Sequence, residues 1–97
     1  MMKGKQKRYL RSLAVNEQPI FQIGKGGIND NLIEQLSDAL EARELIKVRV
    51  LNNSEETAED FAPAVAEATG SELIQVIGHN IVLYKKSIKK PKIELPR

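Results

Sequence analysis

Two stretches with the periodicity of helices, each enclosed by strand-like sequence, constrain the fold of this chain more than any other feature. Apolar side chains recur three and four positions apart over residues 29–43 and again over residues 53–70. Runs rich in Ile, Val and Leu occupy residues 19–23, 45–51 and 73–77, before, between and after them. This succession predicts two strand-helix-strand units with parallel strand pairing and right-handed crossovers.

The middle strand predicts which side of the sheet is buried. Ile46, Val48 and Val50 point one way along it, and Lys47 and Arg49 point the other way. Such alternation is typical of a half-buried strand, so we expect a basic stripe on its solvent side. The two basic residues either bind phosphates or only make this face of the sheet soluble, and the strand by itself favours neither interpretation.

Two further features complete the expected architecture. Residues 5–15 carry an apolar face and are expected to form a helix before the first strand. A Gly-His-Asn turn at 78–80 separates two apolar runs and predicts a hairpin between strands at 73–77 and 81–86. The expected fold class is therefore α/β (α+β): a two-layer domain with a helix followed by strand-helix-strand-helix-strand-strand and a mixed four-stranded sheet. The helices are expected to cover one face of the sheet or to flank it.

The start of the second amphipathic helix is left open by the sequence. Asn53 and Glu56 have the spacing of a capping box, which places Pro63 in the third turn, where it kinks a helix. A start near Glu59 or Asp60 instead places Pro63 in the first turn, where proline is better tolerated. The end is clearer, because Gly70 is suited to a position just past a helix C-terminus.

Length and composition indicate one small domain. We expect a folded domain over residues 1–86 of the 97 and a flexible basic tail over 87–97, which contains two prolines and four basic residues. No apolar run approaches the roughly 18 residues of a membrane span, and the basic start lacks the apolar stretch of a signal peptide. The absence of cysteine excludes disulfides and thiolate metal sites. We therefore expect a cytoplasmic monomer without a membrane partner.

The charges are distributed unevenly between the ends and the middle of the chain. Residues 1–11 hold five basic residues and no acid, and residues 85–97 hold six basic residues and one acid. The stretch between them holds four basic and twelve acidic residues, so the whole chain has a net charge of only +2. Basic ends of this kind indicate a polyanion as partner, although two solvated tails would have the same composition.

A glycine-rich turn follows the first expected strand. Gly24, Lys25, Gly26 and Gly27 connect this strand to the helix that starts near Asn29. The spacing excludes a Walker A loop, which needs Gly-Lys-Ser/Thr, and a dinucleotide fingerprint, which needs glycine where Asn29 stands. The shorter motif G-x-x-G fits, and KH-type modules hold a nucleic-acid backbone with it, although a plain tight turn has the same composition.

Candidate catalytic groups are few. Four acids between residues 55 and 60 have the pattern of a helix N-terminus, where negative charge is favourable. His79, the single histidine, falls in the expected hairpin turn with no evident acid or nucleophile partner, so no enzyme activity, metal site or cofactor is predicted. A base-stacking platform is not predicted either, because Phe21 and Phe61 occupy core positions.

Four motifs, in order, resemble the CRM domain, the RNA-splicing and ribosome-maturation domain whose bacterial stand-alone members are YhbY-like proteins. The motifs are IGKGG at 23–27, ELIKV at 44–48, LIQVIG at 73–78 and VLYK at 82–85. The resemblance extends over residues 5–86. It implies an α/β sandwich similar to the C-terminal domain of translation initiation factor three, in agreement with the order of elements expected above.

The resemblance also implies a function. Family members bind RNA, and the stand-alone bacterial members associate with precursors of the large ribosomal subunit. We therefore expect a non-catalytic RNA-binding protein that acts in ribosome assembly on large-subunit rRNA or its precursor, within pre-ribosomal particles. The family's turn and basic surface, together with neighbouring basic residues, give these candidate RNA-binding residues: Gly24, Lys25, Gly26, Gly27, Lys7, Arg8, Arg11, Lys47, Arg49 and Lys85.

A second interpretation belongs to a different class of protein. The chain is then a non-catalytic interaction module that docks on a ribosomal protein or an assembly GTPase. The acidic middle of the chain would supply that contact, and the basic ends would be incidental.

Overall fold

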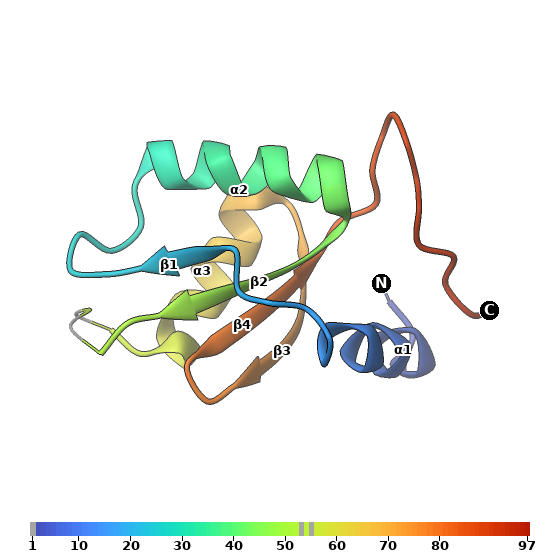
Figure 1. Cartoon of the computed structure of the whole chain (residues 1–97), viewed down its shortest axis with the longest axis horizontal. Coiled ribbons are helices and arrows are strands. Elements are labelled where there is room, and N and C mark those ends of the chain that lie inside the picture. The colour runs from blue at the N-terminus through green and yellow to red at the C-terminus, as the bar shows by residue number, and fades with distance from the viewer. Residues whose placement is uncertain (1, 53, 55) are drawn as a thin grey trace.

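The elements of the fold follow the order expected from the sequence. A computed structural model describes residues 2–52, residue 54 and residues 56–97. Its elements are α1 (Gly4–Ala14), β1 (Phe21–Ile23), α2 (Asp30–Arg43), β2 (Leu45–Val50), α3 (Ala58–Thr69), β3 (Glu72–Ile77) and β4 (Asn80–Tyr84) (Figure 1). The expected α+β class with a mixed four-stranded sheet is confirmed.

The order of strands in the sheet differs from the expectation in one respect. The strands are arranged β1-β2-β4-β3, with β1 and β2 parallel and β4 antiparallel to both of its neighbours. β2 and β3 therefore run in the same direction without pairing, because β4 lies between them. The reason is the continuous apolar run from Ile81 to Tyr84, all of it buried, which is typical of a central strand covered on both faces.

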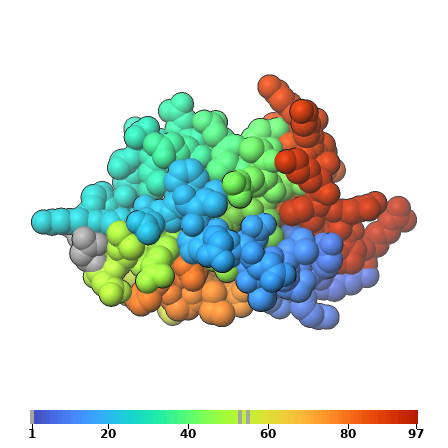
Figure 2. All heavy atoms as spheres, viewed as in Figure 1, coloured from blue at the N-terminus to red at the C-terminus, as the bar shows by residue number. Residues whose placement is uncertain are grey.

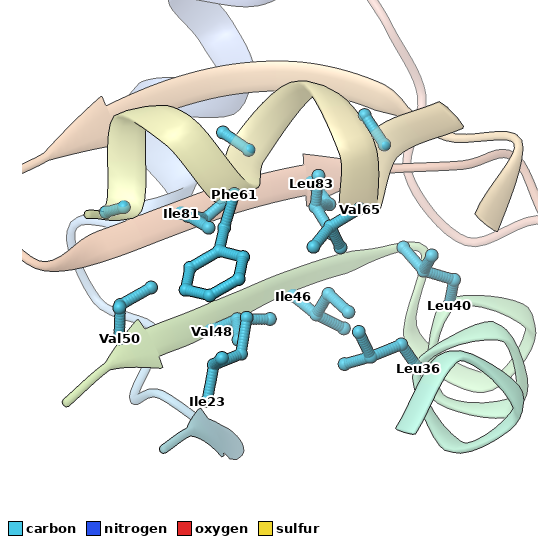
Figure 3. Close-up of a cluster of buried hydrophobic side chains, with 13 residues drawn as sticks. Ile23, Leu36, Leu40, Ile46, Val48, Val50, Phe61, Val65, Ile81 and Leu83 are labelled. Atoms are coloured by element: carbon cyan, nitrogen blue, oxygen red, sulfur yellow. The ribbon is translucent and has the colours of Figure 1, made fainter. Parts of the chain in front are cut away.

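The larger core lies between the sheet and the layer formed by α2 and α3. Figure 3 shows Leu36 and Leu40 of α2 and Phe61 and Val65 of α3 directed at strand side chains such as Ile46. Burying side chains of this size contributes about 1.5–3 kcal/mol each before the entropy of ordering them is counted. This core holds β2 in the register that the alternating pattern predicts.

The opposite face of the sheet is covered at one end only. There α1 packs Leu10 and Ala14 onto Leu45, Val82 and Tyr84. In Figure 1 α3 lies behind the sheet, α1 lies beyond the end of the sheet at which β2 begins, and the connection from α1 to β1 crosses in front of the strands. The rest of this face is the side to which Lys47 and Arg49 point.

α3 begins between the two starts that the sequence left open. Thr57 is its N-cap: the Asp60 N–H donates to the Thr57 hydroxyl (3.2 Å), and the Asp60 carboxylate accepts from the Thr57 N–H. Pro63 therefore falls in the second turn, and the hydrogen bond that it cannot donate is the one to the carbonyl of the exposed residue Glu59. The capping box expected at Asn53 lies outside the described residues. Gly70 ends the helix with φ +66°, as predicted.

The C-terminal segment, residues 87–97, is held against the domain instead of extending from it as a flexible tail. Backbone N–H groups of Ser87, Lys92 and Ile93 donate to the carboxylate of Glu44, the C-cap residue of α2. Sequence reasoning missed this contact because the partners are more than 40 residues apart and a glutamate on a helix carries no mark of a buried role.

Candidate nucleic-acid interface

The G-x-x-G sequence forms a tight turn at the end of β1. The Gly27 N–H donates to the Gly24 carbonyl (3.0 Å), and Lys25 and Gly26 are exposed at its tip. Gly27 has φ +67°, a conformation that costs most other residues energy. A Cβ at Gly27 would lie 3.9 Å from the Phe61 ring, an ordinary contact, so backbone conformation and not space requires the glycine.

The turn leads directly into the N-terminus of α2. Asn29 is the N-cap, and its side-chain oxygen accepts from the Leu32 N–H (2.8 Å). Ile28, next to the turn, packs against the larger core. The helix dipole favours an anion at this position, and Asp30 in the first turn of the helix offsets part of that preference.

β2 connects the turn to the other candidate residues. Arg49 lies opposite Gln22 of β1, one residue before the end of that strand, and Lys47 lies two residues closer to α1 on the same face. Arg49 is exposed and Lys47 half-buried. Since a strand rises about 3.3 Å per residue, the five steps from Leu45 to Val50 span roughly 16 Å. These two cations therefore occupy the face between α1 and the G-x-x-G turn.

α1 brings further cations to the same face of the sheet. Lys7 and Arg11 lie one turn apart on one flank of the helix, and Arg8 is exposed beside them. In Figure 2 the segment with the turn, in cyan, and α1, in blue, lie at opposite ends of one face. The structure thus places Lys47, Arg49 and the basic residues of α1 on one face of the sheet, and the G-x-x-G turn beyond the end of β1, where the chain passes to α2.

Lys85 is the candidate that lies elsewhere. Its Nζ donates to the carbonyl of Thr69 (3.2 Å), at the C-terminus of α3, where a cation is favourable. The strand pattern contains the signal: Lys85 follows Leu83 by two residues, so both point to the face that α2 and α3 cover. Lys85 therefore serves the fold at this position.

Asn80 is a polar residue of this face that sequence reasoning treated only as part of a turn. It lies opposite Arg49 on β4, so the two side chains share the face. Its side-chain oxygen is buried and has no hydrogen-bond partner among the described residues. A buried polar atom without a partner is uncommon in folded proteins, because it has lost its hydrogen bonds to water.

The described part of the chain shows neither a cluster of metal ligands nor a membrane-spanning helix. No group of three or more His, Asp or Glu side chains there has the arrangement of a metal site. None of its helices is long and apolar enough to cross a membrane.

The arrangement of these parts defines a class of protein. These parts form a small α+β domain in which a G-x-x-G turn leads from a strand into a helix, on a mixed sheet that carries basic residues on one face. Within that class, the chain belongs to the CRS1/YhbY (CRM) domain family, whose model matches residues 2–85. The resemblance identified in the sequence is thereby confirmed.

Individual relatives span nearly the whole chain. It is 58% identical over 96 residues to the probable RNA-binding protein YqeI of Bacillus subtilis, with 99% of this chain and all of that protein covered. It is 37% identical over 93 residues to an RNA-binding protein of Haemophilus influenzae, with 96% and 93% covered. A solution structure of a hypothetical protein from Staphylococcus aureus is 60% identical and superposes with a TM-score of 0.82, covering 99% of this chain and 100% of the other.

Proposed function

We propose that this protein binds RNA with the G-x-x-G turn, the exposed face of β2 and the basic residues of α1. One observation carries the proposal: Arg49, Lys47 and the basic residues of α1 lie on one face of the sheet, and Lys25 is exposed in the turn beyond the Arg49 end of that row. The names of the relatives from Bacillus subtilis and Haemophilus influenzae describe RNA-binding proteins, which supports it.

The parts of the surface have different tasks. Backbone N–H groups of the turn and the Lys25 ammonium hold phosphates, and the bare Gly26 lets the RNA backbone approach, since nothing lies within 4 Å of a Cβ built there. Arg49 and Lys47 extend the contact along β2. Recognition is therefore mainly of the backbone and its shape.

The RNA that we propose as ligand is large-subunit rRNA or its precursor. A monomer acting in the cytoplasm would bind it within pre-ribosomal particles and assist assembly without catalysis. The chain belongs to the CRM family. The finer proposal rests on what the resemblance to its stand-alone bacterial members implies, namely association with precursors of the large ribosomal subunit.

Binding measured across a salt series tests the proposal. A large-subunit rRNA fragment and a matched control RNA are titrated with wild type and with the variant Lys25→Asp/Gly26→Asp, after circular dichroism has shown that the variant folds. The charge control is Gln35→Asp/Ala64→Asp/Ala68→Asp, at exposed positions of the α2 and α3 layer, which lowers the net charge by three as the turn variant does. We expect a steep slope of log K against log salt in wild type and in the control, and a large loss in the turn variant. Equal slopes in all three proteins contradict a role for the turn.

A second candidate function is supported by the outer side of the helix layer. Glu34 and Asp38 of α2 and Glu59 and Glu67 of α3 are exposed there, opposite the basic face. This acidic side would suit docking on a basic ribosomal protein or an assembly GTPase. Weak salt dependence toward RNA, together with a protein partner retained after nuclease treatment, would favour it over RNA binding.

A further inference from the structure

The two basic ends of the chain, far apart in the sequence, lie together at one end of the molecule. Residues 1–11 hold five basic residues and no acid, and residues 85–97 hold six and one. Figure 2 shows the two segments, in blue and red, side by side. Like charges repel, so their meeting requires a structural reason.

Part of that reason is contact between the segments. The Gln6 side-chain amide of α1 donates to the Pro96 carbonyl (3.0 Å). Ile93 and Leu95 pack against the smaller core, the cluster to which Leu10 of α1 belongs. The last residues therefore lie along α1 and bury apolar area there.

The stronger reason is the carboxylate of Glu44. It is fully buried, and it accepts from the backbone N–H groups of Ser87 (2.8 Å), Lys92 and Ile93 (2.6 Å each). Burial raises the pKa of Glu44, but the three N–H bonds together lower it further, so the pKa lies below its ordinary value. The group is therefore an ionised acceptor around which residues 87–93 turn.

Glu41, one turn earlier on α2, also accepts hydrogen bonds from the C-terminal segment, on the solvent-exposed side of that segment. Its carboxylate accepts from the N–H groups of Ile88 (2.9 Å) and Lys89 (3.0 Å) and from the Ser87 hydroxyl (2.8 Å). These bonds lower its pKa to about 2. Together the two glutamates accept six hydrogen bonds from the segment, five of them from its backbone.

The glutamates hold the backbone of the segment, so its basic side chains can project outward. Lys86, Lys89 and Lys90 are exposed, and Lys92 donates to the Ala42 carbonyl at the end of α2 (2.8 Å). A hollow of about 450 Å³ between the segment and the end of β4 has Lys86, Lys92 and one acid, Glu94, among its lining residues, and it has room for a ribose-phosphate unit.

We propose that the C-terminal segment, docked on Glu41 and Glu44, extends the RNA-phosphate contact surface beyond the basic residues of α1, at the end of the domain opposite the G-x-x-G turn. The inference rests on the proposed function and extends it to a grip at both ends of a molecule 39 Å long. A flexible tail loses conformational entropy when it binds, whereas a docked segment has lost it on folding, so its lysines bind more tightly.

The test uses a substitution for which charge alone predicts tighter RNA binding and loss of docking predicts weaker RNA binding. Glu41→Gln removes a negative charge, which by itself strengthens binding to a polyanion, yet it places an amide NH₂ against N–H donors. We expect binding of the rRNA fragment to weaken about threefold to tenfold and the Ile88 and Lys89 amides to exchange faster. The matched control is Glu34→Gln, an exposed position on the same helix, and we expect it to bind the RNA as tightly as wild type or slightly more tightly.

Three outcomes would overturn the inference. In the first, Glu41→Gln frees the amides but binds as tightly as the Glu34→Gln control. In the second, Lys89→Ala/Lys90→Ala keeps the docked segment and leaves the salt slope unchanged, where we expect a decrease of about two. Either result leaves the proposed function intact if the Lys25→Asp/Gly26→Asp variant still loses binding. The third is a wild-type protein that binds neither RNA, which contradicts the proposed function and this inference together.

Discussion

The two ends of this domain are ordered by interactions of very different range. At the turn, the hydrogen bonds join residues three apart: Gly27 to Gly24, and Leu32 to Asn29. At the other end, the bonds from Glu44 to Ser87 and Ile93 join residues 43 and 49 apart. The first end is therefore shaped by local conformational preference, and the second by a helix that must already be in place.

Because of this difference, different substitutions disrupt the two ends. A local turn is damaged by a residue that cannot adopt its backbone angles, and the damage stays local. A segment docked on a buried carboxylate is damaged by removing that one acceptor, because several N–H groups lose their partner at once. The predictions below test this contrast, in order of decreasing effect.

Replacing the buried acceptor has the largest expected effect. Glu44→Ala leaves three backbone N–H groups of the segment without their charged partner, and we expect a loss of about 3 kcal/mol in the free energy of unfolding. Urea denaturation measures it. Glu34→Ala, an exposed control on the same helix, should change stability by less than about 0.5 kcal/mol. Equal midpoints for the two variants would show that the docked segment adds nothing to the fold.

A change of backbone preference at the turn comes next. Gly27→Ala forces a Cβ into a residue with φ +67°, so we expect a loss of roughly 1–2 kcal/mol, measured by thermal unfolding. Gly26→Ala is the control, because its φ is not positive and its new Cβ meets no atom within 4 Å. Equal stability of the two variants would rule out conformational strain as the reason for the glycine.

The cap of α2 contributes less. Asn29→Ala removes the side-chain oxygen that accepts from the Leu32 N–H, and we expect a loss of about 1 kcal/mol. Asn31→Ala, two residues further along the helix, should be neutral or slightly stabilising, since alanine is a better helix former. Denaturation midpoints in the reverse order would contradict the assigned cap.

The smallest effect concerns pH at the C-terminal end. The pKa of Glu41 is lowered from 4.5 to about 2, so its contribution to docking is complete above pH 4.5 and is lost as pH falls toward 2. Amide chemical shifts of Ile88 and Lys89 should therefore titrate with a midpoint near 2. The amides of the G-x-x-G turn serve as the internal reference. A midpoint at the ordinary pKa of glutamate would show that the segment is not held as described.

Much of the candidate site could be predicted from residue patterns. Alternation along β2 placed Lys47 and Arg49 on its solvent side, and the G-x-x-G spacing predicted the turn. Lys85 shows the limit, because its partner Thr69 is the last residue of a helix and becomes its neighbour only after packing. Asn80 shows the same limit, since burial of its oxygen depends on a strand from elsewhere in the chain.

Residue patterns alone are enough to predict the elements, their order, the buried side of each and the chemistry of the turn, because these depend on residues within a few positions of one another. Tertiary structure alone decided that β4 lies between β2 and β3, and that the two basic ends meet. Both results depend on contacts between residues far apart in the chain. The buried glutamate at position 44 is the clearest case: its side chain organises the C-terminal segment only because folding removes water from it and brings three N–H groups to it.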